Sequence, residues 1–105
     1  MNLLEKNEKV DNMYRELNDD EIIYMVRENE DNVEILMEKY KPLVAKICNR
    51  YLKAGKSVGM EFDDLMQIGN IAIIDAIKFY KENQKTLFFT YVSKCVENNI
   101  KSELR

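Results

Sequence analysis

A stripe of polar and aromatic side chains near the C-terminal end has residue types that suit contact with nucleic acid. Projection at 100° per residue places five side chains along one side of a predicted helix at spacings of three and four: Tyr91, Lys94, Asn98, Lys101 and Arg105. Cations neutralise phosphates, an amide can hydrogen-bond a base edge, and an exposed ring offers a surface on which a base can stack. An ordinary solvated helix face with one tyrosine would give the same pattern, so the stripe alone leaves both interpretations open.

Catalytic chemistry has few candidate residues in this chain. The sequence contains no histidine, which removes the commonest general base and the commonest metal ligand. The two cysteines, Cys48 and Cys95, do not form a Cys-x-x-Cys pair of the kind found in zinc and redox sites. We therefore expect no enzyme activity, no metal and no cofactor, and two packed thiols in a reducing compartment.

Composition indicates one small helical domain. The 105 residues are 46% hydrophobic and 33% charged, which is typical of a globular protein rather than a disordered one. Three glycines and one proline are too few for the turns of an all-β domain, so we expect an all-α compact helical bundle. No apolar run has the length of a signal peptide or a membrane span, and we expect a cytoplasmic protein without membrane contact.

Charge is distributed unevenly along the chain. The net charge of −3 argues against indiscriminate binding of nucleic acid. Residues 39–60, however, carry six basic residues and no acidic one, so a local basic surface remains possible. Alternating solvated faces would also explain this distribution.

The elements that position the stripe follow from helix signals. Residues 1–16 are polar, and we predict an N-terminal tail there and one helical domain over residues 17–105. A first helix is predicted from a cap at Asn18 to near Asn29. Its predicted inner residues are Ile22, Ile23 and Val26. A second helix is predicted to begin at a cap at Asp31 or Asn32 and to break or kink at Pro42.

Residues 41–52 are predicted to form a helix of their own, because proline is tolerated in a first helical turn. Its inner face would carry Leu43, Val44, Ile47, Cys48 and Tyr51, and its outer face Lys46, Arg50 and Lys53. Residues 54–60 hold two of the three glycines and are predicted to be a loop. Residues 62–80 are so apolar that we expect a helix near the centre of a bundle.

The last helix is predicted to begin at Thr86 or Leu87, after a polar turn over residues 81–85, and to continue to the end. Its inner face would carry Phe88, Phe89, Val92, Val96, Ile100 and Leu104. The stripe described above lies on the other side of this helix.

Two segments in this order resemble region 2 of bacterial sigma factors of the sigma-70 family. They are DDLMQIGNIAIIDAIKFY over residues 63–80 and FFTYVSKCVENNIK over residues 88–101, and residues 90–100 look especially like the sporulation-type factors. The resemblance extends over residues 17–105. It implies a compact helical domain that binds core RNA polymerase and melts the minus-ten element of promoter DNA by binding, without bond chemistry.

The resemblance implies that the helix over residues 64–78 docks on the clamp helices of the beta-prime subunit. The matching contact positions are Asp64, Gln67, Ile68, Asn70 and Ile74. Projection supports part of this set, since Gln67, Asn70 and Ile74 lie on the flank away from Leu65, Ala72 and Phe79. Core burial remains an alternative for each isoleucine. Many family members carry an acid at the position of Ile68, so an apolar contact would replace a charged one there.

The resemblance also implies a set of DNA contacts. The family flips a non-template adenine at minus eleven into a pocket with aromatic walls, which match Tyr80 and Tyr91, and it reads the minus-twelve position with residues that match Asn98 and Lys101. Thr86 and Lys94 stand where primary sigma factors have aromatic residues, which suggests an alternative sigma factor that melts DNA less readily. Apart from the resemblance, the basic residues on the outer face of residues 41–52 fit phosphate contacts, polymerase contacts or a solvated helix face equally well. They are Lys46, Arg50 and Lys53.

A different function remains compatible with the sequence. The chain could be a sigma-like protein-interaction module that binds polymerase or an anti-sigma factor without reading DNA. The sequence stops directly after the minus-twelve residues and before any helix-turn-helix, so we expect a fragment of a longer factor. Residues 54–61 also look longer than the corresponding loop of primary sigma factors.

Overall fold

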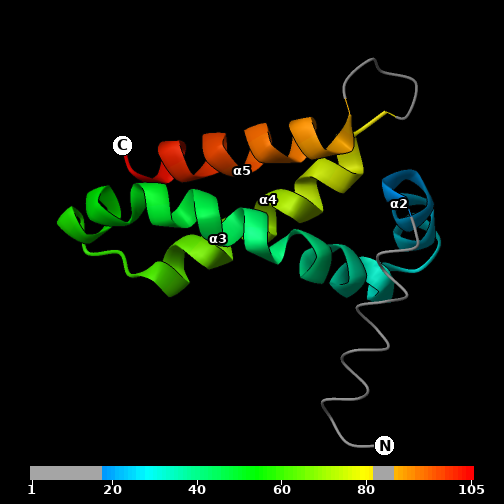
Figure 1. Ribbon diagram of the computed structural model, residues 1–105, viewed down its shortest axis with the longest axis horizontal. Helices are drawn as coiled ribbons and strands as arrows, with labels where there is room; N and C mark the ends of the chain where they lie inside the picture. Colours follow the sequence, from blue (N-terminus) through cyan, green and yellow to red (C-terminus); the bar gives the residue numbers. More distant parts are fainter. Residues whose placement is uncertain (1–17, 82–86) are drawn as a thin grey trace, which may run out of the picture. The chain divides into compact units, whose positions relative to one another are not determined.

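The computed structural model describes residues 18–81 and 87–105, in which all regular structure is helical (Figure 1). The elements are α2 (Asp19–Glu28), a 3₁₀ turn η1 (Glu30–Asn32), α3 (Val33–Ser57), α4 (Phe62–Phe79) and α5 (Phe88–Glu103). The predicted all-α fold is confirmed. The predicted N-terminal tail and Thr86 lie outside the described residues. Among the helices that are described, none has the length and apolarity needed to cross a membrane.

The chain divides into two compact units, residues 1–39 and residues 40–105. In the first unit, α2 begins as predicted: the Asn18 side chain accepts a hydrogen bond of 2.9 Å from the Glu21 amide. The predicted inner residues are all buried: Ile22, Ile23 and Val26. The Lys39 ammonium pairs with the Asp19 carboxylate and connects the start of α2 to α3. Local capping and this ion pair therefore fix the beginning of α2.

The cap of the next element differs from the prediction. The side chain of Asn29, rather than Asp31 or Asn32, accepts a hydrogen bond of 3.1 Å from the Asp31 amide, and the 3₁₀ turn follows. Asn32 instead uses its amide to donate to the Met25 carbonyl oxygen at 3.0 Å, which satisfies the end of α2. The helix α3 then starts at Val33.

Pro42 does not break the helix, and the two predicted helices are the single helix α3. Proline lacks an amide hydrogen, so the carbonyl oxygen of Glu38 loses its partner in the helix. Both Glu38 and Pro42 are exposed, and water can therefore bind that carbonyl. The predicted inner residues over 41–52 are buried or half-buried, as expected.

The predicted loop over residues 54–60 is wrong in its first half, because α3 continues to Ser57. Gly55 is a buried helical residue, and only Gly59 has the left-handed backbone, with φ of 84°, that ends the helix. The amide of Met60 donates to the carbonyl of Gly55 at 2.8 Å, and that of Gly59 donates to Lys56 at 3.2 Å. This pair of bonds is a Schellman motif, which closes α3 before a loop over residues 58–61.

The helix α4 is the apolar element that the sequence predicted. Its buried residues face the other helices of the second unit: Leu65, Gly69, Ala72, Ile73, Ala76 and Ile77. Phe79, which projection placed on the inner side, is 69% exposed, and Phe89 in the first turn of α5 is 53% exposed. Projection treats every turn of a helix as covered by its neighbours, whereas both phenylalanines lie in terminal turns. Apolar surface therefore remains exposed at the C-terminal end of α4 and at the N-terminal end of α5.

The three helices of the second unit meet closely at Gly69 of α4. A Cβ atom at this position would lie 2.4 Å from Cγ1 of Val44 in α3 and 3.6 Å from Cγ1 of Val96 in α5. The relative directions of the helices follow from a second contact. Gly55 near the end of α3 lies against Leu65 near the start of α4, so α4 runs antiparallel to α3. In Figure 1, α5 returns alongside both and runs parallel to α3. This packing leaves one side of α4 and one side of α5 free of the other described helices of the unit.

Candidate nucleic-acid and polymerase interface

The pair of tyrosines predicted to contact a flipped base comes together at the start of α5. The ring of Tyr80, directly after α4, lies 5.5 Å from that of Tyr91 and meets Phe88 edge-on at 5.0 Å. Tyr80 is only 5% exposed, whereas Tyr91 is half-buried. The two residues therefore have different roles in the geometry: Tyr91 presents a ring surface, and Tyr80 supports it from inside.

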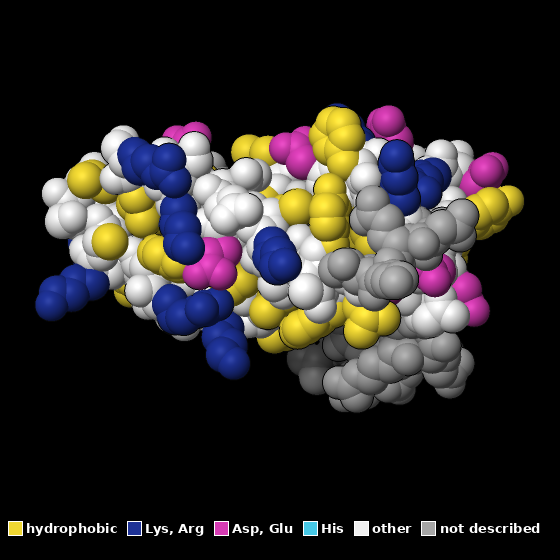
Figure 2. Space-filling view, turned by 90° about the horizontal axis from the view of Figure 1, so that it is seen from above, with side chains coloured by type: hydrophobic (Ala, Val, Ile, Leu, Met, Phe, Trp, Pro, Cys, Tyr) yellow, Lys and Arg dark blue, Asp and Glu magenta, His cyan; other side chains and the backbone are white. Residues whose placement is uncertain are grey.

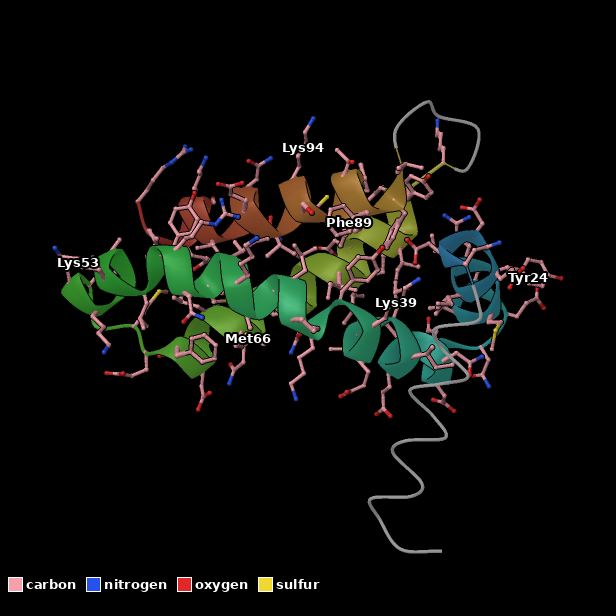
Figure 3. The ribbon with its side chains drawn as sticks, in the orientation of Figure 1. Tyr24, Lys39, Lys53, Met66, Phe89 and Lys94 are labelled. Carbon is pink, nitrogen blue, oxygen red and sulfur yellow. The ribbon has the colours of Figure 1, made fainter. Side chains whose placement is uncertain are left out.

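Further aromatic rings extend this cluster toward α3. Tyr40 of α3 contacts Phe88 edge-on, with ring centroids 5.7 Å apart, and its ring lies 6.2 Å from that of Phe89. Edge-to-face and tilted pairs at such separations are favourable arrangements of aromatic rings. The cluster fixes the first turn of α5 against both other helices, and the half-exposed ring of Phe89 lies at its edge (Figure 3).

The predicted stripe on α5 is exposed except for Tyr91. The exposed members are Lys94, Asn98, Lys101 and Arg105. The three basic residues predicted on the outer face of α3 are exposed as well: Lys46, Arg50 and Lys53. In the view onto α5, Lys and Arg side chains gather over α3 and α5 toward the left (Figure 2). We refer to these seven residues as the basic surface.

An acidic residue that the sequence analysis did not single out lies within the basic surface. The hydroxyl of Tyr51 in α3 donates a hydrogen bond of 2.6 Å to Oε1 of Glu97 in α5. The same carboxylate lies 3.7 Å from Nζ of Lys101 and 3.9 Å from a guanidinium nitrogen of Arg50. The (i, i+4) spacing of Glu97 and Lys101 could have predicted their ion pair from the sequence. The contact between Glu97 and Tyr51 could not be predicted in this way, because the two residues belong to different helices.

Titration of this cluster follows from its contacts. The hydrogen bond from Tyr51 lowers the pKa of Glu97, and the charges of Lys101 and Arg50 lower it further. The hydrogen bond to Glu97 in turn raises the pKa of the Tyr51 hydroxyl. The arrangement therefore favours a charged carboxylate and a neutral phenol at neutral pH.

The exposed side of α4 carries the predicted polymerase contacts. Asp64 and Gln67 are exposed, and the other three are half-buried: Ile68, Asn70 and Ile74. Asp64 also accepts a hydrogen bond of 2.8 Å from the Glu61 amide, so its carboxylate caps the helix. Ile71, which lies one turn after Gln67, is 58% exposed and was not among the predicted contacts. An isoleucine in the polar sector of the helix was the signal that could have identified it.

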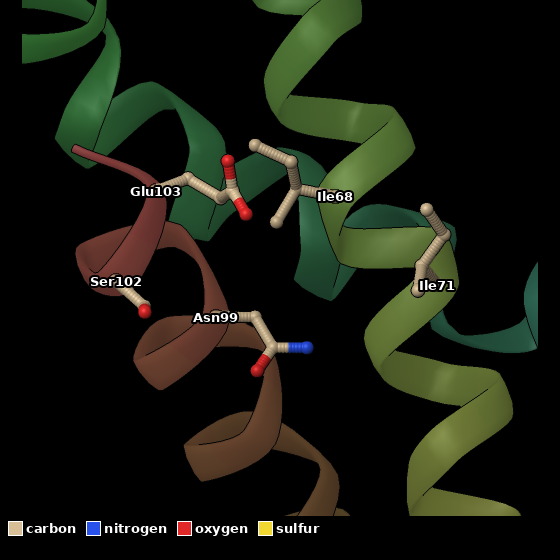
Figure 4. A pocket seen from close by; sticks show the side chains of 5 residues that line it. All are labelled: Ile68, Ile71, Asn99, Ser102 and Glu103. Carbon is tan, nitrogen blue, oxygen red and sulfur yellow. The ribbon is translucent and has the colours of Figure 1, made fainter.

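A shallow pocket of about 220 Å³ borders this side of α4. Its lining combines two isoleucines of α4 with polar residues from the end of α5: Ile68, Ile71, Asn99, Ser102 and Glu103 (Figure 4). The two isoleucines thus form a partly apolar depression between α4 and α5.

Neither cysteine takes part in a disulfide. Cys48 is buried and Cys95 is half-buried, and burial raises the pKa of both thiols. Over residues 18–81 and 87–105, no three His, Cys, Asp or Glu residues are grouped so that they could hold a metal ion.

Comparison with known proteins gives these surfaces a family context. The family model for Sigma-70 region 2 matches residues 36–105, which include α4, α5 and almost all of α3. The chain belongs to the sigma-70 family. The resemblance seen in residues 63–80 and 88–101 is thereby confirmed.

The region 2 domain is similar to several curated sigma factors. It is 35% identical over 71 residues to the RNA polymerase sigma-28 factor of Bacillus thuringiensis subsp. kurstaki. This alignment covers 68% of this chain and 28% of the relative. It is 34% identical over 87 residues to the RNA polymerase sigma-E factor of Clostridium acetobutylicum. This alignment covers 83% of this chain and 35% of the relative. For the RNA polymerase sigma factor FliA of Escherichia coli K12, the identity is 34% over 70 residues, 67% of this chain and 29% of the relative.

The sigma-70 family chain thus spans about a third or less of the length of these relatives. No solved structure matches it significantly. The family membership rests on the region 2 match and on these sequence identities.

Proposed function

We propose that this chain is the part of an RNA polymerase sigma factor that binds the core enzyme through α4 and contacts and melts the minus-ten promoter element through α5. One observation carries the proposal: the residues that match the family's polymerase contacts lie on α4, whereas most of the described residues that match its DNA contacts lie on α5, a different helix of the same three-helix unit. Both partners can therefore be bound at once.

The polymerase side is formed by the exposed side of α4. Gln67 offers hydrogen bonds, and Ile71 and the half-buried Ile68 offer apolar surface to the clamp helices of the beta-prime subunit. Burying an isoleucine side chain contributes about 1.5 to 3 kcal/mol, so these residues can supply affinity that the missing acid at position 68 does not.

The melting step depends on a near balance of energies. Extruding one base from the duplex costs a few kcal/mol, and stacking it on an aromatic ring returns about 1 to 3 kcal/mol. Tyr91 supplies that ring, since Tyr80 is buried behind it. Polymerase binding is then needed to tip the exchange toward the open state.

Recognition of the paired DNA next to the flipped base is assigned to Asn98 and Lys101. An amide can pair with the edge of adenine and an ammonium group with the edge of guanine, each contact being worth about 1 to 3 kcal/mol. The other cations of the basic surface supply phosphate contacts. Because Lys94 replaces an aromatic residue of primary sigma factors, we expect an alternative sigma factor that requires a close match to its promoter.

The experiment that tests the proposal combines polymerase binding and DNA opening. The chain is first mixed with purified bacterial core RNA polymerase, and the resulting complex is used to select a duplex from a random library. The complex is then mixed with the selected duplex. Opening is measured by permanganate reactivity of thymines. Gln67→Ala combined with Asn70→Ala is expected to weaken binding to core polymerase, whereas Asn98→Ala combined with Lys101→Ala is expected to leave it intact and to reduce opening.

The outcomes separate the proposal from its alternative. The exposed Ile71 and the partly apolar pocket beside it would also suit a protein-interaction module that binds polymerase or an anti-sigma factor without reading DNA. That function predicts no permanganate reactivity with the wild-type chain and no effect of changes at Asn98 and Lys101. Failure of the wild-type chain to bind core polymerase would overturn the proposal itself.

A further inference from the structure

We propose that Glu97 sets the selectivity of the basic surface for DNA: its carboxylate holds Lys101 and Arg50 in place and offsets their charge, so that random-sequence DNA is bound weakly. This inference rests on the proposed contact between the basic surface and promoter DNA. It assigns a role to an acidic residue where a phosphate-binding surface would be expected to carry only neutral or basic side chains.

The position of Glu97 is fixed from a neighbouring helix. The Tyr51 hydroxyl, which belongs to α3, donates to Oε1 at 2.6 Å, a length typical of a strong bond to a charged acceptor. The carboxylate side chain is 30% exposed, so it is held partly inside the α3 and α5 contact instead of extending into water. A carboxylate on a free surface helix would have no such second attachment.

Glu97 in turn forms ion pairs with two cations of the basic surface. Nζ of Lys101 is 3.7 Å from Oε1 of Glu97, and the guanidinium of Arg50 is 3.9 Å from the same oxygen. The Lys101 and Arg50 side chains are 48% and 56% exposed, so both remain accessible to DNA. The ion pair therefore orients the Lys101 ammonium group as a hydrogen-bond donor on the same side of α5 as Asn98. It also weakens the attraction of Lys101 to the phosphates of DNA of any sequence.

The energetic consequence concerns phosphate binding. Each cation that neutralises a duplex phosphate contributes about 0.9 to the slope of log affinity against log salt concentration. This attraction is independent of sequence and supplies most of the non-specific affinity. A carboxylate shared by two cations reduces that attraction, while hydrogen bonds to base edges, which depend on placement, are retained. Selectivity for sequence increases as a result.

The test compares Glu97→Gln with Glu103→Gln. Glutamine keeps an oxygen that can accept the Tyr51 hydrogen bond and removes only the charge. Glu103 is an exposed carboxylate of the same helix that lines the pocket beside α4, outside the basic surface. Binding of the full chain to a fluorescent random-sequence duplex is measured between about 50 and 400 mM salt, and thermal unfolding confirms that each variant folds.

For Glu97→Gln we expect affinity for the random duplex to rise roughly 10-fold, and the salt slope to become steeper by about 1 to 2. In complex with core polymerase, the preference for the library-selected duplex over the random one should fall. Glu103→Gln should leave both the slope and the preference near those of wild type. Equal effects of the two variants would show that net charge alone matters and would overturn the proposal.

A second variant separates the effect of the Glu97 charge from any effect of Glu97→Gln on the packing of α3 against α5. Tyr51→Phe removes the hydrogen bond but retains the Glu97 charge, so we expect a lower melting temperature and an unchanged salt slope. Steepening of the slope by Tyr51→Phe alone, or no change in Glu97→Gln, contradicts the proposal. A wild-type chain that fails to bind core polymerase would instead count against the proposed function, since the random-duplex titration does not require polymerase.

Discussion

The ring of Tyr91 lies 5.5 Å from the ring of Tyr80, and Tyr91 is half-buried whereas Tyr80 is only 5% exposed. The ring of Tyr80 also meets Phe88 edge-on, with ring centroids 5.0 Å apart, and this contact holds it beside Tyr91. A stacking platform needs such support, because an ordered ring loses less conformational freedom when a base is placed on it. The buried Tyr80 therefore preorganises the half-buried Tyr91.

Tyr91→Ala is expected to reduce promoter opening by about 5-fold to 100-fold, since stacking of one base is worth about 1 to 3 kcal/mol. Affinity for core polymerase should not change. Permanganate reactivity of the polymerase complex measures the effect, and Tyr91→Phe, which keeps a ring, serves as the control. Equal opening by the alanine and phenylalanine variants would show that the ring does not contact the base.

Gly69→Ala is expected to lower the free energy of unfolding by about 1 to 2 kcal/mol, although alanine favours a helix more than glycine. The added Cβ would lie 2.4 Å from Cγ1 of the buried Val44, and this β-branched side chain has little freedom to move away. Thermal unfolding should show a melting temperature lower by roughly 5 to 15 °C.

Gly55→Ala is the matched control for this stability change. Its Cβ would meet the end of the Leu65 side chain at 3.3 Å, which can shift by a small amount. We expect a change in unfolding free energy within about 1 kcal/mol of zero. If Gly69→Ala proved as stable as Gly55→Ala, close packing of three helices at Gly69 would be refuted.

The hydrogen bond between Tyr51 and Glu97 is expected to stabilise the fold in a pH-dependent way. The pKa of Glu97 lies below its ordinary value of 4.5, so the stabilisation is fully present above that pH and is lost as the pH falls through the lowered value. The pKa of Tyr51 is raised from 10.0, so the stabilisation is also lost as the pH rises through that raised value.

Urea unfolding of wild type and Tyr51→Phe at several pH values measures this effect. The difference in stability between the two proteins should be constant from neutral pH down to about pH 5 and should shrink toward about pH 3. Other carboxylates titrate equally in both proteins and cancel in the comparison. A difference that stays constant throughout the acid range would mean that the hydrogen bond does not depend on the Glu97 charge.

Ile71→Asp is expected to weaken binding to core polymerase by about 10-fold or more, because the apolar surface of one isoleucine is worth about 1.5 to 3 kcal/mol when buried. The fold should tolerate the change, since Ile71 is 58% exposed. Val58→Asp is the control, as Val58 is 56% exposed and belongs to the loop after α3 and not to α4. Equal loss of affinity in both variants, measured by fluorescence titration, would remove Ile71 from the interface.

Periodicity and capping made much of this fold predictable. The cap at Asn18, the apolar helix over residues 62–80 and the exposed stripe from Lys94 to Arg105 were all expected, because each depends on residues within one or two helical turns. The prediction of two separate helices failed at Pro42, where a helix that is exposed on that side can hydrate the freed carbonyl and continue.

The amino-acid sequence by itself determined most of the helical segments, the apolar side of each helix away from its terminal turns and the residues that match the sigma-70 family, since these are properties of short stretches of chain. Only the tertiary structure decided that Tyr80 is covered while Phe89 is exposed, and that Glu97 of α5 meets Tyr51 of α3. These relationships depend on how neighbouring helices pack and where their ends lie, and the projection of a single helix contains no information about either.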